Sequence, residues 1–257
     1  MNKNLVEHNK ELSKLCEKIF AKHIKSENDK DTFLAFVLAK AYKSHKSIML
    51  LCDNQSGQDA AIIVRSLFDL MVNLLYIFQT DSNERFNRYG AFDWVLRKRM
   101  IDYAKSNKNM IEMIEQRAVK KQFGDDQLEE INKQAKEAQI KYKFKTGWSD
   151  KTIEQMAREV GKNDHYQTVY RLQSNVSHSN SRSMLEYVKI QEDKSLLFDI
   201  GGSDVWAEES LVAASDFFLS IIAKINSMLK LGIDEELDSI TKRFLEAMSE
   251  INHKTKS

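Results

Sequence analysis

The chain has 257 residues, enough to bury one large core or two small ones, and its 42% hydrophobic and 30% charged residues are typical of a globular protein rather than a disordered one. A formal net charge of +1 argues against a surface that is basic overall, so any contact with nucleic acid must come from a local patch. The sequence contains no proline and only eight glycines, which removes the usual helix breakers and predicts an all-α protein.

Cysteine usage and hydropathy bear on location. Cys16 and Cys52 stand apart, without the spacing of a zinc site, and fit a reducing cytoplasm. The longest apolar run, 60–78, is interrupted by charged residues that disfavour a membrane span. We therefore expect a cytoplasmic protein without a membrane partner. We also expect no metal and no cofactor, because the sequence has no phosphate-binding glycine loop and no metal-binding motif.

Hydrophobic periodicity predicts a string of helices. These are expected over 5–25, 32–52, 58–80, 83–105, 151–160, from 164 or 165 to about 179, over 205–231 and over 234–251.

Three other segments are less regular. The most polar one, 108–145, is expected to project as a helical hairpin or to cover one flank. A short helix is expected over 184–191 and a lone extended segment over 196–200. Because the chain has no low-complexity linker or internal repeat, a single helical domain over 1–257 is predicted. Its core is expected at roughly 32–107 and 148–251, with a charged helical insertion at roughly 108–147.

The stretch Tyr-Arg-Leu-Gln-Ser-Asn-Val-Ser-His at 170–178 holds the main catalytic candidates. Seven helical steps nearly complete two turns, so Arg171 and His178 share a face about 10 Å apart, with Ser174 between them. An arginine, a hydroxyl and an imidazole are the groups that a phosphoryl-transfer site uses. The alternative is a hydrogen-bonded structural histidine.

A polar stripe marks the central apolar helix. Arg65, Asp69 and Asn73 recur every four residues and must find partners inside the protein. One interpretation is an internal Arg65–Asp69 pair. The other is that the stripe faces the 170–178 helix, where Asp69 orients His178 or pairs with Arg171.

Two basic regions interleave cations with aromatic residues, a pattern suited to phosphate contacts and base stacking. The alternative is a solvated amphipathic helix. The RNA-binding candidates in these regions are Arg97, Lys98, Arg99, Lys141 and Lys143.

The segment Arg65-Ser-Leu-Phe-Asp69, followed later by Tyr170, Ser174 and His178, resembles an uncharacterised bacterial family of helical proteins known only as a domain of unknown function. That family has an R-S-x-x-E/D helix early and a Tyr…Ser…His helix late. The resemblance covers roughly 32–202, and Asp69 stands where glutamate is more frequent.

The spacing of Arg171 and His178 also resembles the R-x(4–6)-H signature of the HEPN superfamily. Its members are all-α, and many are metal-independent ribonucleases of toxin–antitoxin, abortive-infection and CRISPR defence systems. The resemblance implies a homodimer with a composite site, where Arg171 stabilises phosphate charge and His178 moves protons as a ribose 2′-hydroxyl attacks. Leu172 departs from the pattern, which has a polar residue after the arginine.

The leading prediction is thus an all-helical, HEPN-like, metal-independent endoribonuclease of a bacterial defence or toxin–antitoxin system that acts on RNA as a homodimer. Arg171 and His178 would be catalytic. The supporting residues would be Tyr170, Ser174, Arg65, Asp69 and Asn73. The alternative is a non-catalytic helical interaction or sensor module, which binds a defence-system protein through the charged segment 108–145. Leu172 and the near-neutral charge favour this alternative.

Overall fold

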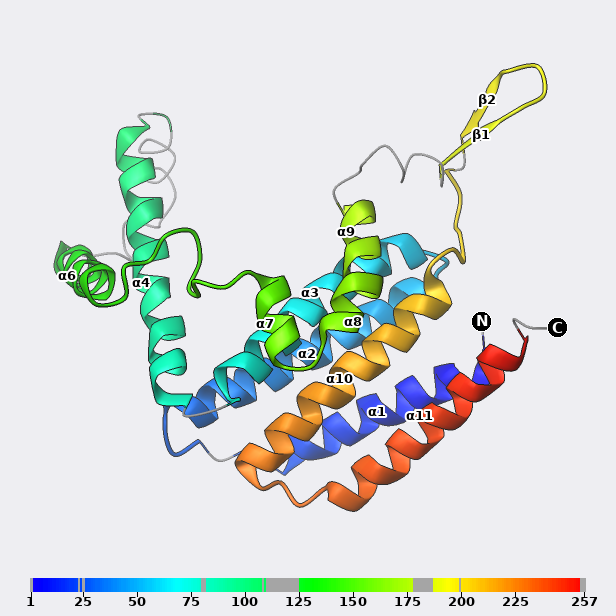
Figure 1. Ribbon diagram of the computed structural model, residues 1–257, viewed down its shortest axis with the longest axis horizontal. Coiled ribbons are helices and arrows are strands. Elements are labelled where there is room, and N and C mark those ends of the chain that lie inside the picture. Colours follow the sequence, from blue (N-terminus) through cyan, green and yellow to red (C-terminus); the bar gives the residue numbers. More distant parts are fainter. Residues whose placement is uncertain are drawn as a thin grey trace. The chain divides into compact units, whose positions relative to one another are not determined.

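The computed structural model describes residues 2–22, 24, 26–79, 82–107, 109, 125–177, 187–198 and 200–254, without the side chains of 82, 125, 126, 175–177 and 252–254. Helices dominate these residues, which confirms the predicted all-α class (Figure 1). The helices are α1 (Lys3–Ala21), α2 (Asp29–Asp53), α3 (Gly57–Ile77), α4 (Ser82–Ser106), α6 (Asp125–Tyr142), α7 (Ile153–Glu159), α8 (Asn163–His165), the π-helix η2 (Tyr166–Tyr170), α9 (Arg171–Ser177), α10 (Ala207–Leu229) and α11 (Asp234–Lys254). The strands are β1 (Val188–Ile190) and β2 (Leu196–Phe198).

The chain divides into two compact units, one formed by Met1–Tyr76 with Met156–Ser257 and the other by Ile77–Gln155. Helix α4 belongs to the second unit because Val95 is buried in one cluster with Tyr142 and Phe144. The sequence had instead predicted that the charged insertion begins after this helix, at 108. The single domain over 1–257 stays a prediction.

Asparagine caps set where the first two helices begin. The side-chain oxygen of Asn2 accepts hydrogen bonds from the backbone N–H groups of Asn4 and Leu5. Asn28 does the same for the first turn of α2. Such caps satisfy N–H groups that the helix leaves unpaired, so both helices begin two or three residues before the apolar pattern that predicted them.

In the first unit, α1, α2, α10 and α11 pack side by side (Figure 1). The core is apolar and aromatic, with Phe217 and Phe218 of α10 fully buried. The ring of Phe68 on α3 lies 5.2 Å from that of Phe217. This contact fixes the face of α3 that points inward, and thereby the position of its polar stripe.

Helices α3 and α10 are long and apolar enough to cross a membrane by length and composition alone. More than half of the apolar window in each helix lies inside the fold, as in core helices of soluble proteins, which pass the same test. The cytoplasmic location stays a prediction.

Strands β1 and β2 form an antiparallel hairpin in which Val188 pairs with Phe198 and Ile190 with Leu196. The short helix expected over 184–191 is therefore wrong for 188–190, while 184–186 lie outside the described residues. The N–H of Gln191 donates to the carbonyl of Ser195 at 2.9 Å, and a left-handed residue, Lys194, completes the turn. This turn pairs the extended segment that had been expected to stand alone.

Candidate functional site

The polar stripe of α3 meets the residue just before α9. The Arg65 guanidinium lies over the ring of Tyr170, 5.1 Å from its centroid, and donates a 3.3 Å hydrogen bond to the Tyr170 hydroxyl. As a hydrogen-bond donor, the Tyr170 hydroxyl in turn lowers the pKa of the Asp69 carboxyl. The three side chains form a chain from cation to phenol to carboxylate, in which Tyr170 is buried and Arg65 and Asp69 are half-buried. This chain joins two segments about a hundred residues apart in sequence.

Burial sets the protonation of this group. It raises the pKa of Asp69 to about 6, because the charge of Arg65 and the hydrogen bond from Tyr170 offset only part of the desolvation. Burial also raises the pKa of the Tyr170 phenol, so this hydroxyl stays protonated and can donate. Asp69 therefore titrates close to neutral pH, as a general acid or base requires.

A π-helix places Tyr170 at this position. Residues 166–170 form η2, and the rings of Tyr166 and Tyr170 stack with centroids 4.9 Å apart. Phe68 of α3 lies 5.1 Å from the Tyr170 ring and holds it from the other helix. Single π turns occur often at functional sites. The sequence did not predict this turn, since the 166/170 spacing of aromatic residues is equally typical of an α-helix.

Arg171 is exposed, and its hydrogen bond is to its own helical segment rather than to α3. Its Nη1 donates to Oε1 of Gln167 at 3.0 Å, one turn earlier, so the predicted pairing with Asp69 is not found. Ser174 is half-buried on the next turn. His178 lies outside the described residues, and so does its predicted contact with Asp69.

The third member of the stripe points along its own helix. The Asn73 side-chain amide donates to the backbone carbonyl of Asp69 at 2.7 Å. The prediction that the α3 stripe faces the 170–178 segment therefore agrees with the geometry at Tyr170. Of the predicted site residues, the structure brings together Arg65, Asp69 and Tyr170.

A second polar cluster was missed by sequence reasoning. Nε2 of His165 lies 2.9 Å from Oδ2 of Asp216, and Nζ of Lys162 lies 3.8 Å from the same oxygen. Although burial opposes ionisation of Asp216, the histidine contact and the lysine charge hold its pKa below the usual range. His165 and Asp216 line a groove of about 880 Å³ between η2, α10 and α11. No sequence spacing links 165 to 216, so only the fold reveals this pair.

The RNA-binding candidates lie in the second unit, and several already have partners. Arg97 and Lys98 form ion pairs within α4, at 2.6 Å to Asp93 and 2.7 Å to Asp102. Arg99 donates to the Lys145 carbonyl at 3.1 Å. The ion pairs offset the charges of Arg97 and Lys98, and the hydrogen bond holds the Arg99 side chain in place. This face should therefore bind a polyanion less tightly than three unpaired cations would.

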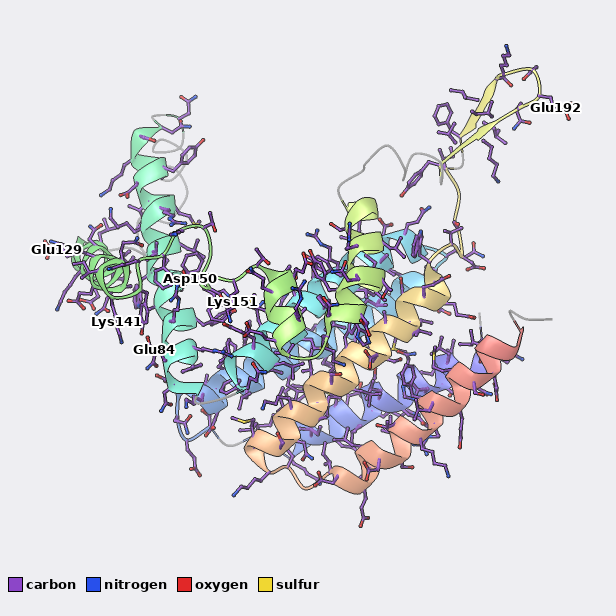
Figure 2. The ribbon with its side chains drawn as sticks, in the orientation of Figure 1. Glu84, Glu129, Lys141, Asp150, Lys151 and Glu192 are labelled. Carbon is purple, nitrogen blue, oxygen red and sulfur yellow. The ribbon has the colours of Figure 1, made fainter. Side chains whose placement is uncertain are left out.

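The remaining two candidates are more available. Lys141 lies over the Tyr142 ring at 4.7 Å and projects from α6 (Figure 2). Lys143 is exposed, with a left-handed backbone that ends the helix. Arg88 of α4 is a further cation of this unit, and its side chain is engaged within the unit. It bonds the Trp148 carbonyl at 2.7 Å and Asp150 at 2.6 Å.

Among the residues that the structure describes, no three His, Cys, Asp or Glu side chains gather as a metal site would require. A family model described as a family of unknown function (DUF5677) matches residues 31–195, more than half of the chain. Comparison with curated proteins and with solved structures finds no match. The resemblance to the HEPN superfamily stays a prediction.

Proposed function

The chain belongs to this family of unknown function, and we propose from its own residues that it is a HEPN-like, metal-independent endoribonuclease of a bacterial defence or toxin–antitoxin system. The observation that carries the proposal is the Arg65–Tyr170–Asp69 chain at the start of α9. It brings a carboxyl with a pKa of about 6, on Asp69, to Tyr170, and the residue after Tyr170 is the exposed Arg171. A carboxyl whose pKa is shifted by burial and by a specific charged partner is a recurring feature of acid–base sites.

The proposed reaction uses the RNA's own nucleophile. The ribose 2′-oxygen attacks the adjacent phosphorus and loses its proton to a base, and the bond to the 5′-oxygen breaks as that oxygen gains a proton from an acid. The products are a 2′,3′-cyclic phosphate and a 5′-hydroxyl. His178 would transfer the protons, and Arg171 would stabilise the phosphate charge.

The other residues would support these two. Arg65, Tyr170 and Asp69 would fix the start of α9 and tune the local charge, with Ser174 and Asn73 beside them. RNA phosphates would bind Lys141 and Lys143 more readily than Arg97, Lys98 and Arg99, whose charges or geometry are already engaged. Two copies would each contribute to the site.

The test is cleavage of a single-stranded RNA in EDTA, beside DNA and 2′-O-methyl RNA of the same sequence. Only RNA should be cut, because the other two lack a free 2′-hydroxyl. Arg171→Ala and His178→Ala should each lower the rate about 100-fold or more, the usual effect of losing a charge-stabilising or acid–base group.

Stability separates a catalytic loss from a folding defect. Arg171→Ala should change the free energy of unfolding by less than about 0.5 kcal/mol, because the side chain is exposed. Arg243→Ala on α11, an exposed arginine paired with Glu11 at 2.8 Å, is the matched control and should keep full activity. A wild-type protein that cuts no RNA, or an Arg171→Ala variant that cuts it normally, would overturn the proposal.

A second candidate is a non-catalytic interaction or sensor module of a defence system. Apolar side chains on the surface favour it, since Leu172, directly after Arg171, is 40% exposed. In that case neither wild type nor Arg171→Ala would cut RNA, whereas Leu172→Ser would weaken binding of the partner protein.

A further inference from the structure

The β1–β2 hairpin has one wholly apolar face. Residues directly opposite in an antiparallel pair share a face, so the pairs Val188/Phe198 and Ile190/Leu196 place four apolar side chains together. Three of them are more than half exposed: Ile190 at 71%, Leu196 at 55% and Phe198 at 60%. The opposite face carries Lys189 beside Leu197.

An isolated hairpin with such a face is incomplete as a folded unit. Two strands alone are marginally stable in water, and an apolar face of this kind is normally covered by another sheet or by a helix. The exposed fractions show that nothing among the described residues covers this one. This face is therefore available to a partner outside the described residues.

Charge narrows the choice of partner. The apolar face carries no charged side chain, and the hairpin as a whole has two cations, Lys189 and Lys194, against two anions, Glu192 and Asp193. Glu192 projects from the tip of the turn (Figure 2). A polyanion or an anionic lipid surface would find no net positive charge to bind, whereas a second hairpin of the same kind is not repelled.

We propose that the hairpin is a self-association surface, on which the apolar faces of two copies of this chain pack against each other about a two-fold axis. Such isologous pairs are the commonest way in which identical chains assemble. Together with Ile200, which follows Phe198 by two residues and is 96% exposed, the four face residues offer roughly 500 Å² of apolar area in each copy, so two copies would bury at most on the order of 1,000 Å², at the low end for specific interfaces. An interface of this size is expected to form a weak, concentration-dependent dimer.

This inference deepens the proposed function and rests on it for the purpose of the dimer, a site shared by two copies. The association itself is measured without RNA. Arg171→Ala should associate like wild type, so a failure of catalysis and a failure of dimerisation are separable.

Neighbouring leucines supply a matched pair of variants. Leu196 and Leu197 are 55% and 54% exposed, but only Leu196 lies on the apolar face. Leu196→Glu places a charge in the interface, whereas Leu197→Glu faces Lys189 across the strands. Circular dichroism should show the same helix content in both variants, because both side chains are more than half exposed and lie outside the helices.

Sedimentation velocity over a concentration series is the test. Wild type and Leu197→Glu should move from monomer to dimer as concentration rises, and Leu196→Glu should need at least a tenfold higher concentration. A wild-type chain that stays monomeric at every concentration overturns the proposal. So does a Leu197→Glu variant that loses association as fully as Leu196→Glu.

Discussion

Replacing Tyr170 by phenylalanine should change the stability of the protein at high pH and leave it nearly unchanged at low pH. The substitution removes the hydroxyl that donates to the ionised Asp69 carboxyl, whose pKa is about 6. Hydrogen bonds to buried charged groups are worth about 1.5–3 kcal/mol, and the half-buried position of Asp69 argues for the lower end. A loss of about 1.4 kcal/mol corresponds to a rise of about one pKa unit.

The sign follows from linkage. The folded carboxyl has a raised pKa, so the native state holds its proton up to about pH 6, while the unfolded chain has already released it near the ordinary aspartate pKa of 3.8. Stability contributed by the protonated form is lost as pH rises through that window. Tyr170→Phe extends the window upward, so its deficit against wild type should grow by about 1.4 kcal/mol between pH 5 and pH 8.

Urea unfolding of both proteins at pH 5 and pH 8 measures this difference, and a carbon-13 NMR titration of the Asp69 carboxyl measures its pKa directly. Tyr166→Phe is the control, since Tyr166 stacks on Tyr170 without contributing to the Asp69 pKa. An equal deficit at both pH values would refute the hydrogen bond. If Asp69 takes part in cleavage, the acid limb of the rate profile should move upward by the same unit.

Two further substitutions test the core. His8 is 2% exposed and stacks on Phe244, and burial together with the charge of Arg243 lowers its pKa to about 4. The unfolded chain takes up this proton already below about pH 6.5, so wild type loses stability as the pH falls from 7.5 to 5. His8→Phe does not have this loss, so over that range its free energy of unfolding in urea should rise by about 2 kcal/mol relative to wild type. Parallel stability curves would contradict this. A Cβ at Gly57 would lie 2.2 Å from the Val205 carbonyl oxygen, so Gly57→Ala should lower the free energy of unfolding by about 2–4 kcal/mol. Gly90 in α4 has open space around it, so Gly90→Ala should raise the free energy of unfolding by up to about 1 kcal/mol. Equal effects at the two glycines would be the contrary result.

Much of the fold could be predicted because helix periodicity is a local signal. The helices appear within a few residues of the expected bounds, and the early starts trace to Asn2 and Asn28, whose capping role depends on the next turn rather than on the apolar pattern. The hairpin was missed because Val188–Ile190 is too short for periodicity to separate strand from helix. The turn closed by the Gln191–Ser195 hydrogen bond is what pairs the two segments as strands.

The candidate site was predictable only in outline. The α3 stripe required a buried partner, and the 170–178 segment was the correct region. The partner is nevertheless Tyr170 rather than Arg171, because the π turn over 166–170 changes which residue faces α3. The His165–Asp216 pair depends on the packing of η2 against α10, which no spacing in the sequence encodes.

Asp69 distinguishes the two candidate functions. Its raised pKa means that burying the ionised carboxylate lowers the stability of the folded protein. The shift from 3.8 to about 6 corresponds to at most about 3 kcal/mol at neutral pH, and to about 1–2 kcal/mol for a half-buried group. Asp69→Asn removes the charge but keeps an oxygen that can accept from Tyr170, so urea unfolding at pH 8 should show equal or greater stability. A residue retained for catalysis would combine that gain with a loss of RNA cleavage, the trade-off expected where a strained group serves a reaction. If Asp69→Asn is instead clearly less stable at pH 8, the carboxylate is a structural partner of Arg65 and the interaction module becomes the better account of the protein.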